Sequence, residues 1–155
     1  MKHTRIIVTR YGGPDALELL EEECPEPKDD EVRVRVLAAG VSLPDVLMRE
    51  GVHPETPALP FSPGWDLVGV VDRLGKGVSG ITAGRTVAAL PISGAYAEFV
   101  CLPERELVPV PSQLDAAERV LLAGLGDVRY SPRQRMSLKD YATARFLRNR
   151  GNLAI

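Results

Sequence analysis

The sequence predicts a mainly β domain, either a sandwich or a partly open barrel with a few short helices, and three observations favour this. The 155 residues suit one domain of ordinary size, and the hydrophobic share of 45% is enough for a core. Gly and Pro number 14 and 13 while aromatic residues make up 5%, a composition typical of short strands joined by turns. Candidate strands recur at ~8–12-residue spacing without regular β-α-β alternation, which disfavours a doubly wound sheet.

The first strands are predicted from short runs that end in turn residues. Residues 4–10 are rich in β-branched side chains, and the turn signal of residues 11–14 ends this run. Residues 17–22 fit either a strand or a helical turn. Residues 31–39 alternate strictly, which predicts a half-buried strand with valines on one face and arginines on the other; these are Val32, Val34 and Val36 against Arg33 and Arg35.

A short helix follows this strand and ends at residue 49. Ser42 can cap it, Pro44 suits its first turn, and Asp45 favours the positive end of the helix. The prolines between residues 53 and 63 then predict a stiff, extended loop. Further strands are expected at the ranges 67–74, 85–90, 96–102 and 107–110, and a second short helix at 115–122.

The charge divides the chain into a domain at residues 1–118 and a basic tail at 119–155. The domain has 11 Lys and Arg against 19 Asp and Glu, whereas the tail has 8 Lys and Arg against 2 Asp. In the tail, residues 137–140 form a capping box and Gly151 suits a helix end. We therefore expect one tail helix over residues 138–149.

Several classes of protein are disfavoured by composition. A net charge of −2 gives no overall attraction to nucleic acid or to an anionic membrane. Apolar runs fall short of the ~20 residues of a membrane span, and the N-terminus lacks the apolar region of a signal peptide. Cys24 and Cys101 lack zinc-site spacing, so two free thiols in a reducing cytoplasm are expected.

Six segments in a fixed order carry a resemblance to a known family. They are YGGPD at 11–15, AGVSLPD at 39–45, PFSPGWDLVG at 60–69, VVDRLG at 70–75, AGRTV at 83–87 and GAYAEF at 94–99. Together they resemble the N-terminal, GroES-like catalytic domain of medium-chain dehydrogenases/reductases, and above all the zinc-free quinone oxidoreductase branch. The resemblance covers about residues 2–118. It implies a GroES-like, partly open β-barrel with a few short helices, followed here by a C-terminal helical tail.

The same resemblance implies that no metal is bound. Zinc-dependent relatives carry a Cys where this chain has Ser42, and His and Glu where it has Trp65 and Asp66. Serine is a poor zinc ligand, tryptophan is none, and one carboxylate cannot hold the metal alone. The run of four closely spaced cysteines that forms a structural zinc lobe in relatives is also missing.

Three polar residues are the candidate catalytic residues, namely Ser42, Asp45 and His53. Relatives often carry Asn near the nicotinamide at the position of Ser42, so Ser42 is also the candidate cofactor contact. Asp45 matches an acidic residue common in the family, and His53 could donate a proton to a substrate oxygen. The structural alternatives are a helix cap for Ser42, a first-turn position for Asp45 and a solvated loop for His53. Trp65 is expected to be a pocket wall or core aromatic.

The resemblance implies hydride transfer from NADPH to a quinone or an activated double bond. Relatives continue into a Rossmann domain, but the nearest Gly-rich segment here, residues 121–127, lacks the third glycine and a following β-α-β unit. We therefore expect no cofactor on the isolated chain, with NADPH implied only if a Rossmann domain is supplied.

Two classes of function stay open. One is a truncated or split zinc-independent oxidoreductase-like protein that carries only the substrate side and is inactive alone. The other is a non-catalytic binding or interaction module that uses the barrel cleft or the basic tail; nucleic acid is not an expected partner. Without a covering domain, an apolar surface should be hidden by a homodimer, by a separate Rossmann-domain chain or by the tail, and dimerisation is slightly favoured. Its expected residues are Leu43, Leu47, Val52, Leu59, Phe61 and Trp65.

Overall fold

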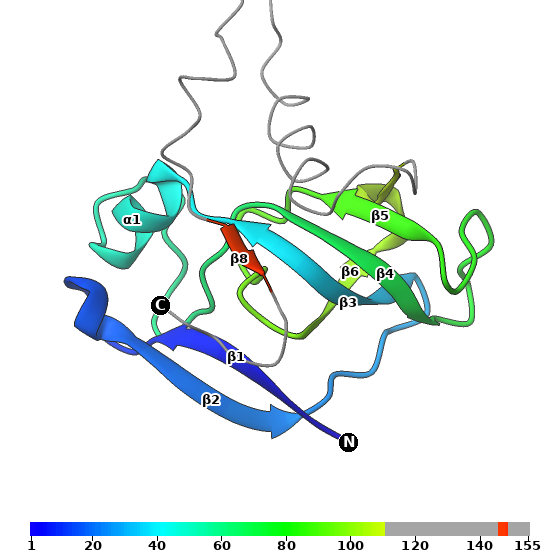
Figure 1. The fold of residues 1–155 in the computed structure, drawn as a ribbon, viewed down its shortest axis with the longest axis horizontal. Helices are drawn as coiled ribbons and strands as arrows, with labels where there is room; N and C mark the ends of the chain where they lie inside the picture. Colours follow the sequence, from blue (N-terminus) through cyan, green and yellow to red (C-terminus); the bar gives the residue numbers. More distant parts are fainter. Residues whose placement is uncertain (111–145, 149–155) are drawn as a thin grey trace, which may run out of the picture.

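The computed structural model describes residues 1–110 and 146–148, which are mainly β (Figure 1). One short α-helix, α1 (Leu43–Arg49), lies among them, together with two single 3₁₀ turns, η1 (Pro14–Ala16) and η2 (Glu104–Glu106). None of these helices is long and apolar enough to cross a membrane. The strands are β1 (Lys2–Val8), β2 (Leu17–Glu23), β3 (Glu31–Gly40), β4 (Leu67–Leu74), β5 (Thr86–Ala89), β6 (Phe99–Pro103), β7 (Val108–Pro109) and β8 (Phe146–Arg148). The expected mainly β fold and the first short helix are confirmed.

The strands form two antiparallel sheets. β1 and β2 make a hairpin, while the larger sheet has the order β6-β3-β4-β5-β7 with β8 added beside β3. Figure 1 shows the hairpin as a separate layer beside the larger sheet. Single bridges from Arg5 to Ala97 and from Val8 to Phe61 join β1 to the loops of the larger sheet. The sheets of the described residues do not close into a barrel, which agrees with the partly open form that was expected.

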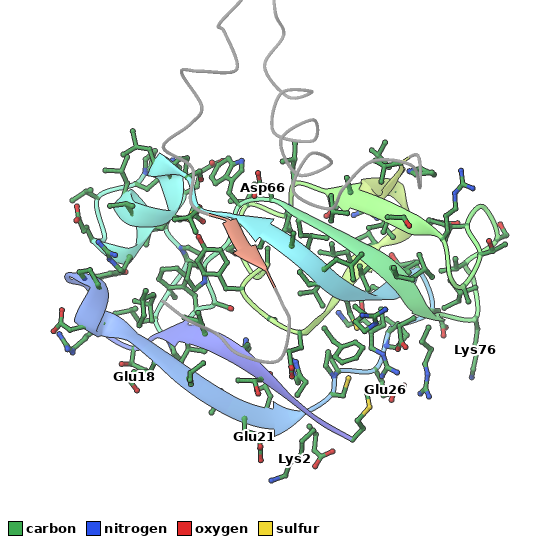
Figure 2. All side chains as sticks on the ribbon, in the orientation of Figure 1. Lys2, Glu18, Glu21, Glu26, Asp66 and Lys76 are labelled. Carbon is green, nitrogen blue, oxygen red and sulfur yellow. The ribbon has the colours of Figure 1, made fainter. Side chains whose placement is uncertain are left out.

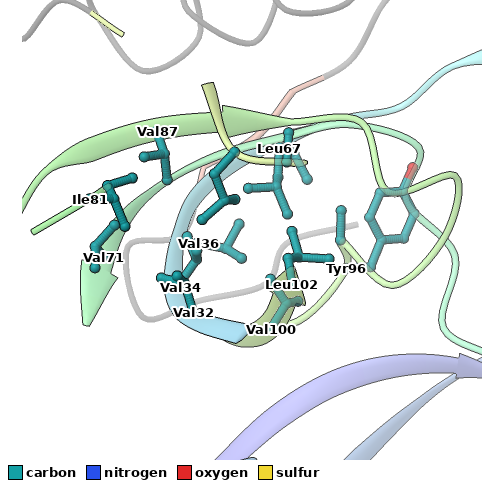
Figure 3. Packing of buried hydrophobic residues seen from close by; sticks show 14 of the residues in the cluster. Val32, Val34, Val36, Leu67, Val71, Ile81, Val87, Tyr96, Val100 and Leu102 are labelled. Atoms are coloured by element: carbon teal, nitrogen blue, oxygen red, sulfur yellow. The ribbon is translucent and has the colours of Figure 1, made fainter. Parts of the chain in front are cut away.

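Strand β3 lies at the centre of the larger sheet and of the core. β4 pairs with one edge of β3, and the other edge is divided between β6, at Glu31–Arg35, and β8, at Ala38–Gly40. The predicted alternation is confirmed on the valine face, where Val32 and Val34 are fully buried (Figure 3). Burial of this apolar face against β4, β5 and β6 stabilises the domain.

The opposite face of β3 differs from the expectation, because Arg33 is buried rather than exposed. Its Nε donates to Asp72 Oδ2 at 2.6 Å, and its Nη1 donates to the carbonyl oxygen of Pro25 at 3.0 Å. The guanidinium also lies 5.6 Å from the centre of the Phe99 ring. The β2–β3 connection and β6 therefore cover this charge while satisfying its hydrogen bonds, which the two-residue period cannot reveal.

Two boundaries also differ. The strand expected from residue 96 begins at Phe99, because the backbone of Tyr96 is hydrogen bonded to Ile6 and Pro63 instead. In the tail, residues 146–148 form β8 where a helix over 138–149 was expected, because their backbone pairs with β3. The rest of that expected helix, and all of the one at 115–122, lies outside the described residues.

We predict that Gly69→Ala destabilises the fold through a backbone collision. A Cβ at Gly69 would lie 2.5 Å from the carbonyl oxygen of Arg35 on the neighbouring strand. We expect the free energy of unfolding to fall by about 3 kcal/mol in urea titrations. The matched control is Gly84→Ala, where a Cβ meets nothing within 4 Å and only the positive φ of 80° costs stability, by about 1 kcal/mol. Equal losses in the two variants would contradict the close packing of β3 on β4.

Candidate functional site

The candidate site lies where β3 ends, α1 begins and the chain runs through Pro63–Asp66 into β4. Figure 2 places Asp66 at this end of the larger sheet, close to the end of β3 and to β8. We call this region the β3–α1 junction. Of the residues that the sequence singled out, Ser42 and Asp45 lie in it directly, and His53 lies at its border.

Asp45 is a buried carboxylate whose oxygens are occupied by the protein itself. The amide nitrogen and Oγ of Ser42 donate to Asp45 Oδ2 at 2.8 and 2.7 Å. The amide nitrogen of Gly64 donates to Oδ1 at 3.0 Å. Asp45 is only 4% exposed, so it joins the start of α1 to the segment before β4. The structural alternatives for Ser42 and Asp45, a helix cap and a first-turn residue, both occur in the fold.

Asp66 is the residue of the junction that the sequence treated only as a replaced zinc position. Its Oδ1 accepts a hydrogen bond from the amide nitrogen of Gly40 at 2.8 Å. A Cβ on Gly40 would lie 2.4 Å from Oδ1, so only glycine permits this approach. Burial and, to a smaller extent, the nearby charge of Asp45 raise the pKa of Asp66 to about 6 against the lowering effect of the Gly40 amide. Asp66 can therefore hold or release a proton near neutral pH.

Tyr96 is the second residue that the sequence reasoning missed. Its hydroxyl donates to the carbonyl oxygen of Gly40 at 3.2 Å. Burial raises the pKa of Tyr96 far above its usual range, and the charges of Asp45 and Asp66 act in the same direction. The hydroxyl therefore stays protonated. The GAYAEF segment could have indicated this residue, because its glycine and small residues leave room for a buried tyrosine.

His53 lies beside the junction rather than within its hydrogen bonds. Its ring meets the ring of Trp65 edge-on, with centroids 5.6 Å apart. Its Nδ1 accepts from the amide nitrogen of Glu55 at 3.2 Å. Trp65 packs in turn against the cluster of Val8, Met48 and Phe61, as expected for an aromatic wall. Among the described residues, His53 therefore contacts Trp65 without a hydrogen bond to Ser42, Asp45 or Asp66.

The apolar surface predicted at this end of the domain is smaller than expected. Leu43 and Val52 are exposed by 69% and 66%, whereas Leu47, Leu59 and Trp65 are partly covered. Phe61 was expected to be exposed, but its side chain is buried because its backbone pairs with Val8 of β1. Within the described residues, no three His, Cys, Asp or Glu side chains gather closely enough to hold a metal ion.

We predict that Asp66→Asn alters how stability depends on pH. Because the folded protein holds the Asp66 proton more tightly than the unfolded chain, native Asp66 makes stability fall as pH rises from about 4 to about 6. The neutral amide lacks this loss and still accepts from Gly40, so the variant should be more stable at pH 7.5 by about 1–2 kcal/mol. Urea titrations at pH 4.5 and 7.5 measure the difference, and Asp29→Asn on the surface is the control. A variant as pH-dependent as the native chain would show that Asp66 titrates normally.

Comparison with known proteins identifies the family to which this chain is similar. The model of the alcohol dehydrogenase GroES-like domain matches residues 28–112. The pig (Sus scrofa) quinone oxidoreductase is 36% identical over 112 residues, which cover 71% of this chain and 34% of the relative. The human protein "synaptic vesicle membrane protein VAT-1 homolog-like" is 33% identical, over 73% of this chain and 27% of the relative. The structure of Escherichia coli quinone oxidoreductase complexed with NADPH superposes with a TM-score of 0.68 at 30% identity, covering 73% of this chain and 35% of that chain.

The chain thus spans between about a quarter and a third of the length of these curated relatives. The matched residues include β3, α1, β4 and the whole β3–α1 junction. The order of motifs, the open antiparallel sheets and the matching family model agree with one another. This chain therefore belongs to the alcohol dehydrogenase GroES-like domain family, within the medium-chain dehydrogenases/reductases that include the quinone oxidoreductases.

Proposed function

We propose that this chain supplies the substrate side of a zinc-independent, NADPH-dependent quinone or enone oxidoreductase-like protein and is inactive alone. The observation that carries the proposal is the protonatable Asp66 at the β3–α1 junction, in a domain whose relatives are quinone oxidoreductases. Ser42 and Trp65, which replace two zinc ligands of other relatives, support zinc independence.

The described residues do not fit the whole cofactor. A pyrophosphate is held by free backbone amides at a helix N-terminus. α1 is the one α-helix within residues 1–110, and its capping residue Ser42 already directs its amide to Asp45. NADPH, when bound, supplies the hydride, and Ser42 is the residue of this chain that we assign to the nicotinamide end. Residues outside the described part, or a separate Rossmann-domain chain, must hold the rest.

The substrate oxygen is where this chain can contribute chemistry. When a quinone or an enone accepts a hydride, negative charge develops on its oxygen, and a nearby acid lowers the barrier by protonating that oxygen. Asp66 meets the requirement because its raised pKa leaves part of it protonated near neutral pH. His53, whose ring contacts Trp65, is the second candidate donor. Asp45 positions the Gly64 amide instead, since its oxygens are already occupied.

A second function is a non-catalytic interaction module. The exposed Leu43, at the start of α1, and Val52, just after its end, favour it, because exposed apolar side chains can belong to a contact surface. The similarity to a VAT-1 homolog-like protein also supports it, since that name states no reaction. The partner would be a second copy of this chain or a Rossmann-domain chain.

We also propose a cytoplasmic location, because Cys24 and Cys101 are both free.

A chimera that fuses this chain to the Rossmann domain of the Escherichia coli quinone oxidoreductase distinguishes the two proposed functions. We expect quinone-dependent oxidation of NADPH, measured by loss of absorbance. Asp66→Asn should lower the rate by about 10²-fold, as for loss of a general acid, while Asp15→Asn leaves it unchanged. A folded chimera that binds NADPH and turns over no quinone or enone would contradict the enzymatic proposal and favour the interaction module.

For the isolated chain we predict no NADPH binding at micromolar concentrations, because α1 is the one α-helix within residues 1–110 and the amide of its capping residue Ser42 already donates to Asp45. Isothermal titration calorimetry measures this directly, with intact Escherichia coli quinone oxidoreductase as the positive control. A clear 1:1 isotherm with the isolated chain would show that residues outside the described part form a nucleotide site.

A further inference from the structure

The loop of residues 90–95 is held at both ends against the segment that carries Asp66. Where the loop begins, Ala89, the last residue of β5, pairs with Leu67, the residue after Asp66. Figure 2 places Asp66 at this end of the larger sheet. Where the loop ends, the amide nitrogens of residues 94–96 donate to the carbonyl oxygens of residues 62–64, at distances of 2.8 to 3.3 Å. The loop therefore borders the β3–α1 junction.

Ile92 lies in the middle of this loop, in a backbone conformation that does not suit its side chain. Its φ of 68° is in the left-handed region, which β-branched residues rarely adopt. Among residues 1–110 and 146–148 it is the one residue other than glycine with a positive φ. Burial does not offset this strain, because the side chain is 40% exposed. The packing of the domain therefore gives no reason for an isoleucine at this position.

We propose that Ile92 is a specificity-determining residue that contacts the apolar ring of the substrate and selects quinones or enones without a charged substituent. This inference rests on the proposed function. Strained residues persist where function requires them, and Ile92 is both strained and accessible beside Asp66, the acid assigned to the substrate oxygen. Leu43, which follows Ser42, is 69% exposed and adds a second apolar side chain at the junction.

The chemistry of the side chain defines the substrate class. An isoleucine can cover the face or edge of an uncharged ring and remove it from water. It offers no hydrogen bond to a sulfonate or carboxylate on that ring, so a charged substituent would lose water without compensation. The Ile92 contact therefore favours apolar rings, while Asp66 meets the polar oxygen.

The strain has a direct test in the full chain. Ile92→Asn introduces a residue that tolerates the left-handed region, whereas the control Ile92→Val keeps the β-branch and therefore the strain. We expect the midpoint of urea unfolding to rise in the asparagine variant and not in the valine variant. An asparagine variant no more stable than the valine variant would remove the ground of the proposal.

Substrate contact is measured by fluorescence, because Trp65 is the only tryptophan of the chain. We expect menadione, an uncharged naphthoquinone, to quench it saturably in the native chain and in Ile92→Val. Binding should be about tenfold weaker in Ile92→Asn, and a sulfonated naphthoquinone should bind the native chain less tightly than menadione. Leu19→Asn, at a leucine of β2 that is 63% exposed, is the control for an added polar group. Absence of saturable quenching, or equal affinity in the native and Ile92→Asn chains, would overturn the contact.

The chimera with the Escherichia coli Rossmann domain distinguishes this inference from the proposed function. There we expect Ile92→Asn to raise KM for menadione, whereas Asp66→Asn lowers kcat. An active chimera whose KM does not respond to Ile92→Asn would refute the ring contact alone. A chimera without turnover, combined with menadione binding that depends on Ile92 in the full chain, would refute the enzymatic function and retain the apolar site.

Discussion

The absence of a side chain at Gly40 is the constraint on which the junction depends. Gly40 is the last residue of β3, and its missing Cβ lets the Asp66 carboxylate reach its amide across the end of the sheet. The same residue accepts from Tyr96 and pairs with β8. The central strand, the segment before β4 and the tail strand therefore meet at one backbone unit. Any larger residue there would have to displace Asp66.

Two carboxylates lie close together in this junction, and their surroundings give them different roles. Asp45 accepts three hydrogen bonds and joins α1 to the segment before β4. Asp66 accepts one from Gly40, and burial raises its pKa to about 6. Hydrogen bonds stabilise the charged form of a carboxylate, whereas burial and a neighbouring negative charge disfavour it. Such a division of roles between two carboxyl groups is typical of sites where one group fixes the geometry and the other exchanges a proton.

Patterns local in the sequence predicted β3, β4 and α1, because alternation and capping depend on neighbouring residues. The burial of Arg33 could not be predicted in this way, since its partners Asp72 and Phe99 lie on other strands. The role of Asp66 could not be predicted from local patterns either, because its pKa depends on burial between two segments. Residues 146–148 show the opposite error, where local capping signals favoured a helix but pairing with a distant edge favours a strand.

Docking of β8 and protonation of Asp66 are coupled if both act on Gly40. A segment that holds the Gly40 amide on Asp66 lowers the pKa of that carboxyl group, so it must itself dock more tightly when Asp66 is ionised, by the same factor, because binding linkage is reciprocal. The docked strand is then favoured above about pH 6 and weakened below it, as Asp66 becomes protonated. A partner that displaces β8 would in turn favour the protonated carboxyl group. The edge of β3 and the proton at the junction thus form one thermodynamic unit, although their residues lie some 80 to 110 positions apart in the sequence.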